Sequence, residues 1–262
     1  MMQSKPGNLD NRFPSRALLF IGIPLLFSLL SLSSSCSHYP HHEGGGSPGH
    51  LPHAEGSTAE TVSQPHVHHA FKDAELWSKR FDAPDRKDWQ KPEEVIELMD
   101  IESGMTVADI GAGTGYFLGY LSKAVGAQGM VLGLDIEPSM VDFMANRAKR
   151  ENWTNVEVRV VHPDDPGLPP NSVDRILIVN TWHHIADREH YSRKLYDALK
   201  PGGKVLVVDF TLESPHGPPV SQRLRPEEVM AELQAGGFEV ELLQETLPNQ
   251  YIVAGHHPPE RE

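Results

Sequence analysis

The chain contains 262 residues, of which 39% are hydrophobic and 23% are charged, a composition typical of a soluble globular protein. Its formal net charge is −13 at pH 7, and its lysines and arginines do not gather into a basic block, which argues against a nucleic-acid partner. The length is sufficient for one sizeable α/β domain. Cys36 is the single cysteine of the sequence, so an intrachain disulfide is excluded.

The N-terminus has the pattern of an export signal. Lys5, Arg12 and Arg16 precede an apolar stretch at residues 17–32, and small residues follow up to Cys36. The apolar stretch is short for a membrane span and is interrupted by glycine and proline. This arrangement resembles a bacterial lipoprotein signal, in which a cysteine at this place is the residue that carries the lipid.

The resemblance implies a signal peptide at residues 1–35 and a membrane anchor on the periplasmic side through a lipidated Cys36. Ser33 stands where such signals usually have leucine. An uncleaved anchor and ordinary cleavage stay open as alternatives. A misplaced start codon is a further alternative, and a segment that is no working signal would leave the protein in the cytoplasm.

Residues 36–70 have the composition of a disordered linker. They are rich in glycine, proline and histidine and hold eight of the 15 histidines of the chain. Imidazoles in such a segment can capture a metal ion. Because the histidines have no fixed ligand spacing, a solvated tether without a specific metal site is the favoured interpretation.

From residue 71 onward the sequence alternates between helical and strand-like segments. Apolar spacing and a proline at a helix start predict an N-terminal helical extension at residues 71–105. Seven segments bounded by turn residues predict strands, at residues 106–109, 130–135, 156–161, 175–179, 204–209, 238–243 and 250–254. Four segments between them predict helices, at residues 116–125, 138–150, 188–199 and 226–235. This order is typical of a doubly wound, Rossmann-like α/β sheet, which binds ligands beyond the carboxyl ends of its strands.

A glycine-rich loop follows the first predicted strand. In the stretch VADIGAGTGYF, Asp109 ends the strand, and Gly111, Gly113 and Gly115 follow at alternate positions. A dinucleotide fingerprint would need its third glycine at Tyr116, and no phosphate-loop lysine follows. The spacing therefore disfavours both NAD and a phosphate loop, while a plain tight turn stays possible.

Acidic residues end the next two predicted strands. Asp135 closes the second strand, where its carboxylate can accept hydrogen bonds from both hydroxyls of a ribose. Asp164 and Asp165 follow the third strand, where an acid would face the amino group of adenine. A solvated turn is the alternative for this pair.

The four stretches DIGAGTG, LDIEPSMV, DDPGLP and LKPGGKVLVVDF together resemble the class I S-adenosylmethionine-dependent methyltransferases, over about residues 71–255. The resemblance implies a seven-stranded sheet whose last strand is antiparallel, and a cofactor-binding domain at residues 106–257, followed by a tail at residues 258–262. It also implies that S-adenosyl-L-methionine is the cofactor and assigns residues to its parts. These residues are Asp109, Gly111, Gly113 and Gly115 for the methionine, Asp135 with Ile136 for the ribose, Asp164 or Asp165 for adenine, and Asn180 beside the methyl group.

Methyl transfer needs a nucleophile held in line with the sulfur–methyl bond and, in many cases, a base for its proton. His183 and His184 follow the fourth strand, as in the ubiquinone/menaquinone-type and small-molecule branches of the family. His184 is the first candidate base, and packing at the strand end is the alternative for His183. Asp209, which ends the fifth strand, is a second candidate base or a residue that orients one. Arg223, in a predicted substrate-side flap at residues 216–229, is expected to pair with an acidic substrate or to form a surface salt bridge.

The sequence therefore predicts a methyltransferase for a small-molecule acceptor, anchored to a membrane if the signal is used. The main alternative is a tethered, non-catalytic binding protein that keeps the fold. An NAD-dependent oxidoreductase is disfavoured by the glycine spacing and by the acidic residues around the predicted site. The acceptor and the oligomeric state stay undetermined by the sequence.

Overall fold

The computed structural model describes residues 73–259, and the predicted signal, the linker and Cys36 lie outside this range. The described part begins with three short helices, α1 (Ala74–Phe81), α2 (Arg86–Gln90) and α3 (Pro92–Leu98). Four longer or central helices follow, α4 (Leu118–Val125), α5 (Pro138–Arg150), α6 (Arg188–Ala198) and α7 (Pro226–Gly236). Two 3₁₀ turns are present, η1 (Trp182–His184) and η2 (Val220–Gln222). Within residues 73–259 no helix has both the length and the apolar character needed to cross a membrane.

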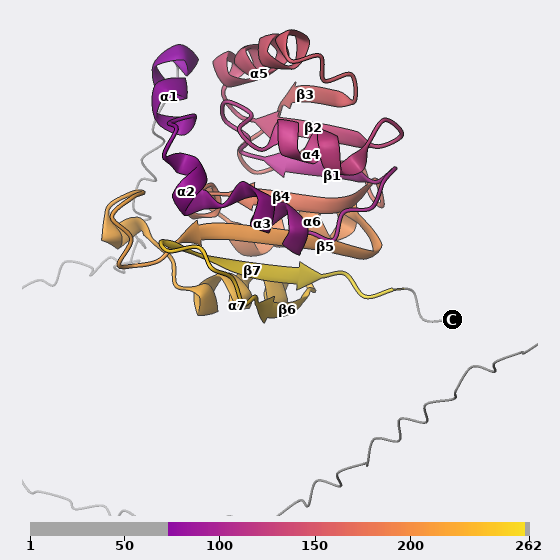
Figure 1. Cartoon of the computed structure of the whole chain (residues 1–262). Helices are drawn as coiled ribbons and strands as arrows, with labels where there is room; N and C mark the ends of the chain where they lie inside the picture. The colour runs from indigo at the N-terminus through magenta and orange to yellow at the C-terminus, as the bar shows by residue number, and fades with distance from the viewer. Residues whose placement is uncertain (1–72, 260–262) are drawn as a thin grey trace, which may run out of the picture. The chain divides into compact units, whose positions relative to one another are not determined.

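Seven strands form one sheet in the order β3-β2-β1-β4-β5-β7-β6. The strands are β1 (Thr106–Ile110), β2 (Met130–Asp135), β3 (Val156–Val160), β4 (Val173–Val179), β5 (Leu199–Phe210), β6 (Glu239–Leu242) and β7 (Gln250–His256). The first five pair in parallel, whereas β7 runs antiparallel to both β5 and β6. In Figure 1, β5 and β7 accordingly point in opposite directions. The predicted seven-stranded, doubly wound sheet with an antiparallel last strand is confirmed.

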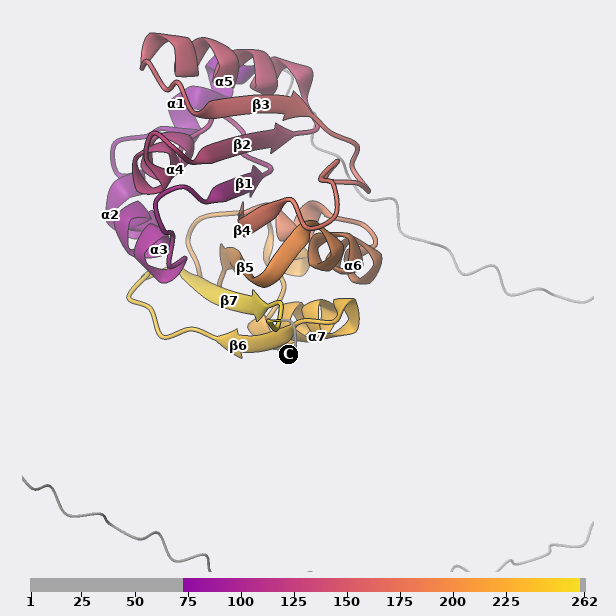
Figure 2. The same cartoon turned by 90° about the vertical axis from the view of Figure 1, so that its right-hand side faces the viewer.

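Helices cover both faces of the sheet because its strands alternate apolar residues between two cores. Val107 of β1 packs with α3, α4 and α5 on one face, and Ala108 packs with α6 and α7 on the other. Leu177 and Ile178 of β4 divide in the same way. Figure 2 shows α4 and α6 on opposite sides of the strands. Burial on both faces explains the apolar runs in the central parallel strands, whereas the edge strand β3, VEVRV, is only partly buried.

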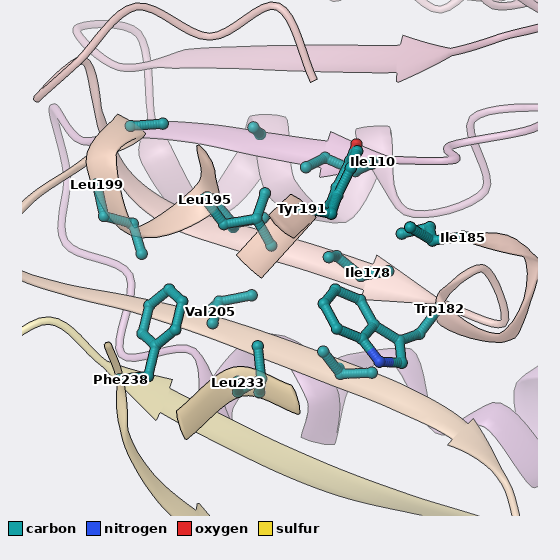
Figure 3. Packing of buried hydrophobic residues seen from close by; sticks show 14 of the residues in the cluster. Ile110, Ile178, Trp182, Ile185, Tyr191, Leu195, Leu199, Val205, Leu233 and Phe238 are labelled. Carbon is teal, nitrogen blue, oxygen red and sulfur yellow. The ribbon is translucent and has the colours of Figure 1, made fainter. Parts of the chain in front are cut away.

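Trp182 anchors the turn that follows β4. Its indole is fully buried and packs in the core shared with Tyr191 of α6 and Leu233 of α7 (Figure 3). The indole Nε1 donates a hydrogen bond of 2.8 Å to Glu232 Oε2, which satisfies the polar group of a buried tryptophan. This anchor fixes η1, the turn that carries both predicted histidines.

Two details differ from the predicted elements. Strand β5 starts at Leu199 instead of at the predicted residue 204, with an irregular register against β4. Gly202 and Gly203 exchange backbone hydrogen bonds of 2.9 Å with His257, so these glycines are built into the sheet ladder. Helix α2 lies within the predicted helical extension at residues 71–105, but it was not predicted as a separate helix, because its five residues are too few to show a helical period.

Candidate cofactor and acceptor site

A cavity of about 580 Å³ opens at the carboxyl ends of the parallel strands. The β1–β3 side contributes Ile110, Gly111, Ala112, Gly113, Thr114, Asp135, Ile136, Met140, Val161, His162 and Pro163. Helices α1 and α2 and the turn between them contribute Trp77, Arg80, Phe81, Ala83, Asp85, Arg86 and Trp89. The β4–β5 side contributes Val179, Asn180, Thr181, His183, His184, Ile185, Tyr191, Phe210, His216, Gly217, Pro218 and Pro219. The N-terminal helices thus form a wall of the cavity rather than a separate extension.

The glycine loop brings backbone to the wall of this cavity. Gly111, Gly113 and Gly115 all have positive φ angles, of 70°, 57° and 76°, a region that residues with a Cβ rarely adopt. A Cβ on Gly111 would also lie only 2.3 Å from the side chain of Thr181. The loop therefore depends on glycine for its conformation, and at Gly111 also for its contact with the turn after β4.

Asp135 lies at the end of β2 and lines the cavity. Its Oδ2 accepts a 2.8 Å hydrogen bond from the backbone N–H of Gly113, and its Oδ1 accepts one of 3.0 Å from Glu137. Burial raises the pKa of this carboxyl above its usual value, and the backbone donors oppose that rise. Each carboxylate oxygen has a second lone pair, so Asp135 keeps the capacity to accept two hydroxyl groups of a ribose.

Arg86 lines the cavity, whereas Asp109, near the end of β1, is buried and is not among the lining residues. Burial raises the pKa of Asp109 to about 7, with Asp135 adding to the rise and Arg86 opposing it. Burial also lowers the pKa of Arg86 to about 10, while the phenol of Tyr116 and the carboxylates of Asp82 and Asp109 oppose this shift. Arg86 therefore stays a cation at neutral pH beside a carboxyl group whose protonation is sensitive to pH.

The guanidinium of Arg86 is held in place on several sides. Its Nη1 donates to the carbonyl oxygen of Phe81 at 2.6 Å, and its Nε and Nη2 donate to Gln90 Oε1 at 3.3 and 3.1 Å. The group lies 4.0 Å from the centre of the Tyr116 ring. Two of its five N–H groups have no partner among the described residues and are available for an anion. Sequence reasoning missed Arg86, since it lies on the short helix α2, which the sequence did not mark as a separate helix.

The amide that accepts from Arg86 belongs to a buried hydrogen-bond network of three amide side chains. Gln90 is fully buried, and its Nε2 donates to Gln250 Oε1. Gln250 Nε2 donates to Asn180 Oδ1 at 2.5 Å, and Asn180 Nδ2 lies 3.4 Å from Gln90 Oε1. Asn180 lines the cavity with a φ angle of 55°. The network joins α2, the end of β4 and the start of β7 around the site.

The two acids predicted to face adenine lie away from the cavity. Asp164 is exposed and pairs with the ring of His162. Asp165 accepts hydrogen bonds from Lys194 Nζ at 2.9 Å and from the backbone N–H of Gly167 at 2.8 Å. The residues of this turn that line the cavity are His162 and Pro163. Local partners hold both carboxylates at the surface, which the sequence pattern alone does not reveal.

Ile136 supplies an apolar surface beside Asp135. It lines the cavity and is one of the exposed large hydrophobic residues of the described part. Val161, after β3, lines the same side of the cavity. An apolar pair next to a carboxylate that can accept ribose hydroxyls is suited to the face of a nucleoside base.

The predicted residues His183 and Asp209 are directly paired. His183 Nδ1 lies 2.9 Å from both carboxylate oxygens of Asp209, and each side chain is only 4% exposed. Asp209 Oδ1 also accepts a 2.8 Å hydrogen bond from the backbone N–H of Phe210. The ring of His184 lies beside that of His183, with ring centres 4.2 Å apart, and both line the cavity. A buried carboxylate therefore orients the ring of His183, the histidine that the sequence did not place first as a candidate base.

The donor set fits S-adenosylmethionine, with one correction to the expected charge. The methionyl end of that molecule is a zwitterion, for which Arg86 and Asp109 offer opposite charges, and its ribose and adenine match Asp135 and Ile136. The sequence predicted an acidic site without a basic group. Two arginines, Arg80 and Arg86, line the cavity within the described residues.

This chain is similar in sequence to known methyltransferases. Residues 101–248 match the family described as a methyltransferase domain. The chain is 31% identical over 152 residues to a demethylmenaquinone methyltransferase of Oceanobacillus iheyensis, covering 55% of this chain and 61% of that protein. It is 33% identical over 118 residues to a ubiquinone/menaquinone biosynthesis C-methyltransferase of Idiomarina loihiensis, covering 44% of this chain and 47% of that protein. The chain thus spans about half the length of the curated relatives it matches.

Solved structures share the fold of this chain. The crystal structure of a SAM-dependent methyltransferase from Aquifex aeolicus aligns with a TM-score of 0.66 at 29% identity, over 71% of this chain and 98% of that one. A phosphoethanolamine N-methyltransferase of Haemonchus contortus in complex with S-adenosyl-L-methionine shares the fold, with a TM-score of 0.55 at 18% identity over 71% of this chain and 60% of that one. The chain therefore belongs to the methyltransferase-domain family and has the class I S-adenosylmethionine-dependent methyltransferase fold.

Proposed function

We propose that the protein transfers a methyl group from S-adenosylmethionine to a small-molecule acceptor, with His183 as the general base. One observation carries this proposal: His183, held by the buried carboxylate of Asp209, lines the same cavity as Gly111, Gly113 and Asp135. A cofactor site beside an oriented base is what methyl transfer to a protonated nucleophile requires. A non-catalytic binding protein would not need such a pair.

Cofactor binding is assigned to residues on the β1–β2 side. Asp135 accepts hydrogen bonds from the ribose hydroxyls, and the two spare N–H groups of Arg86 bind the carboxylate of the methionyl group. Asp109, when ionised, attracts the ammonium group. The bound cofactor supplies an electrophilic methyl group on a positively charged sulfur. Because both Asp109 and Arg86 are buried, their charges act through a medium that screens them poorly.

Proton removal is assigned to His183. With Nδ1–H donating to Asp209, the neutral ring presents Nε2 as a proton acceptor. An acceptor that places its O–H, N–H or S–H against Nε2 gives up that proton as its nucleophilic atom takes the methyl group, the sulfur–methyl bond breaks and S-adenosylhomocysteine leaves. Where a ring carbon of a deprotonated phenol is the nucleophile, that carbon then releases its own hydrogen as a proton, which restores the aromatic ring. Asp209 then stabilises the imidazolium and stays ionised. The neighbouring His184 is assigned to the acceptor wall.

The acceptor class to test first comes from the names of the similar proteins. Those proteins are a demethylmenaquinone methyltransferase and a ubiquinone/menaquinone biosynthesis C-methyltransferase. Trp89, Phe210 and His216 line the acceptor half of the cavity with aromatic surface, which suits a ring. We therefore propose a reduced, hydroxyl-bearing quinone as acceptor.

The test is a transfer assay with S-adenosylmethionine labelled on its methyl group. Reduced demethylmenaquinone is offered to the full-length protein, alongside a panel of phenols, amines and thiols. Label in an extracted product, lost in His183→Ala, supports the proposal. Cofactor binding without transfer to any member of the panel would favour the tethered binding protein instead.

We further propose that residues 1–35 are a signal and that Cys36 carries a lipid, as the sequence pattern indicates. The test is metabolic labelling with a fatty acid in wild-type and Cys36→Ala cells, followed by fractionation. Label confined to the wild-type membrane fraction supports the anchor. Unlabelled protein in the cytoplasm would refute it, and would also place the enzyme where S-adenosylmethionine is made.

A further inference from the structure

The segment after β5 forms a wall of the cavity without regular secondary structure over most of its length. His216, Gly217, Pro218 and Pro219 line the cavity, and the segment lies beside α2 in Figure 1. The ring of His216 stacks on Trp89 of α2, with ring centres 4.8 Å apart and planes inclined by 16°. We call residues 211–219 the wall loop. The shape of the cavity therefore depends on the conformation of this loop.

The side chain of Arg223 supplies hydrogen bonds that a helix or strand would otherwise supply to this loop. Its Nε donates to one carbonyl oxygen and its Nη2 to another, while the two N–H groups of Nη1 are shared among three, and every acceptor is a backbone carbonyl oxygen of the wall loop. The acceptors are Thr211, Leu212, Ser214, His216 and Pro218, at 3.0, 3.0, 2.7, 2.9 and 2.9 Å. The loop is thus wrapped around a single guanidinium group.

This arrangement replaces both roles expected for Arg223 from the sequence. Within the described residues Arg223 forms no ion pair, and its donors point into its own loop rather than toward a ligand. A planar guanidinium has five N–H groups in a fixed fork, whereas a lysine ammonium has three at one point. Lysine therefore cannot reach the same set of carbonyl groups.

The loop is also pressed against the rest of the wall. A Cβ on Gly217 would lie 2.4 Å from the ring of Phe210, and Gly217 has a φ angle of 90°. Trp89 lies near the same ring, with ring centres 6.1 Å apart. A change in loop shape must therefore move His216 and Phe210, which form the aromatic side of the cavity.

We propose that Arg223 is a positioning residue that fixes the acceptor-side wall by holding the wall loop in shape. Assigning this half of the cavity to the acceptor rests on the proposed function. In the strand order β3-β2-β1-β4-β5, the ribose-binding carboxylate ends β2, whereas His183 and the wall loop follow β4 and β5. Arg223 consequently affects the acceptor side and leaves cofactor affinity unchanged.

The test compares Arg223→Ala and Arg223→Lys with the full-length wild type. Arg193→Ala is the matched control, since Arg193 is an exposed arginine of α6. Hydrogen exchange of peptides covering residues 211–222, the affinity for S-adenosylhomocysteine and the melting temperature are measured for each. The fluorescence of Trp89 is obtained as the difference from Trp89→Phe made in each background.

In Arg223→Ala we expect exchange in residues 211–222 to become at least about 10-fold faster. Trp89 emission should change as His216 leaves the ring, while S-adenosylhomocysteine affinity stays within about twofold of wild type. Added millimolar guanidinium should restore slow exchange in Arg223→Ala, and Arg223→Lys should stay fast. Should Arg223→Ala fail to fold, Arg223→Lys gives the same comparison.

The proposal would be overturned if both Arg223 variants kept the wild-type exchange rate in residues 211–222 and the wild-type Trp89 emission. It would also be overturned if they lost as much S-adenosylhomocysteine affinity as Asp135→Ala does. Failure of the proposed function gives a different result. In that case the wild type itself does not bind S-adenosylhomocysteine, or binds it and transfers no methyl group to any acceptor of the panel, whatever the exchange of the wall loop.

Discussion

His183 Nδ1 lies 2.9 Å from both carboxylate oxygens of Asp209, and both side chains are almost fully buried. The pair joins the turn after β4 to the end of β5. Trp182, buried in the core, holds η1, the turn that carries His183. Orientation of the ring by a buried carboxylate fixes which nitrogen meets the acceptor. Catalytic function of the cavity is therefore tested first at this pair.

Replacing His183 by alanine should lower kcat by about 10²–10⁴-fold, the usual contribution of a positioned general base. Affinity for S-adenosylhomocysteine should stay near the wild-type value. Asp209→Asn should lower kcat less, because the ring is still present but its tautomer is no longer fixed. The measurement is turnover of an acceptor found in the transfer assay. The control is His190→Ala, since His190 is an exposed histidine on α6. A larger loss of kcat in His184→Ala than in His183→Ala would make His184 the general base instead.

Arg86 should discriminate between ligands with and without a methionyl group. Arg86→Ala should weaken binding of S-adenosylhomocysteine by about 10–100-fold, the effect of a lost charged hydrogen bond. It should not weaken binding of 5′-methylthioadenosine, which lacks the carboxylate. Calorimetric titration of both ligands measures this. Equal losses for the two ligands would mean that Arg86 supports the fold of the cavity rather than the carboxylate.

The buried carboxyl of Asp109 should make stability depend on pH. Its pKa is about 7 in the folded protein, above the usual 3.8 or so of an aspartic acid. Between these values the folded state binds the proton and the unfolded state does not, so this group lowers stability as the pH rises. The free energy of unfolding of the wild type, relative to Asp109→Asn, should fall by on the order of 1 kcal/mol per pH unit from about pH 4 to pH 7. Denaturant titrations across this range measure it, and a difference that does not vary with pH would contradict the shift.

Two glycines of the loop should differ in their tolerance of alanine. Alanine at the positive φ angle of Gly113 should cost about 1 kcal/mol, since its Cβ would meet only the Phe81 ring at 3.6 Å. Gly111→Ala should cost clearly more, because its Cβ would overlap the side chain of Thr181. Thermal or denaturant unfolding without ligand measures both variants. Equal costs would show that Thr181 moves aside without penalty.

The sequence predicted the sheet well because apolar strands and turn residues are local signals. The bounds predicted for β2 and α5 are those observed. Pairing of His183 with Asp209 could not be deduced, since the two residues are 26 positions apart and only the sheet order brings them together. For Asp164, spacing alone indicated a place in the site that the structure does not give it. Its position matched the family motif, but its side chain pairs with His162 and does not line the cavity.

Residues on the N-terminal helices were the largest omission. Arg86 and Trp89 lie in a helix of five residues, too short for a periodic signal, and their roles come from contacts with distant residues. Arg223 was noticed, but its carbonyl partners depend on the folded shape of the wall loop. Residues that shape the acceptor side thus escaped prediction, whereas the cofactor side was marked by glycine and acid spacing.

Binding of S-adenosylhomocysteine by the full-length protein is the most direct test of the central claim. Calorimetry should show binding by the wild type and by Asp142→Ala, which removes an exposed acid of α5. Asp135→Ala should bind about 10–100-fold more weakly, because the ribose loses a charged acceptor. Tight binding of NADH with no response to S-adenosylhomocysteine would contradict the account.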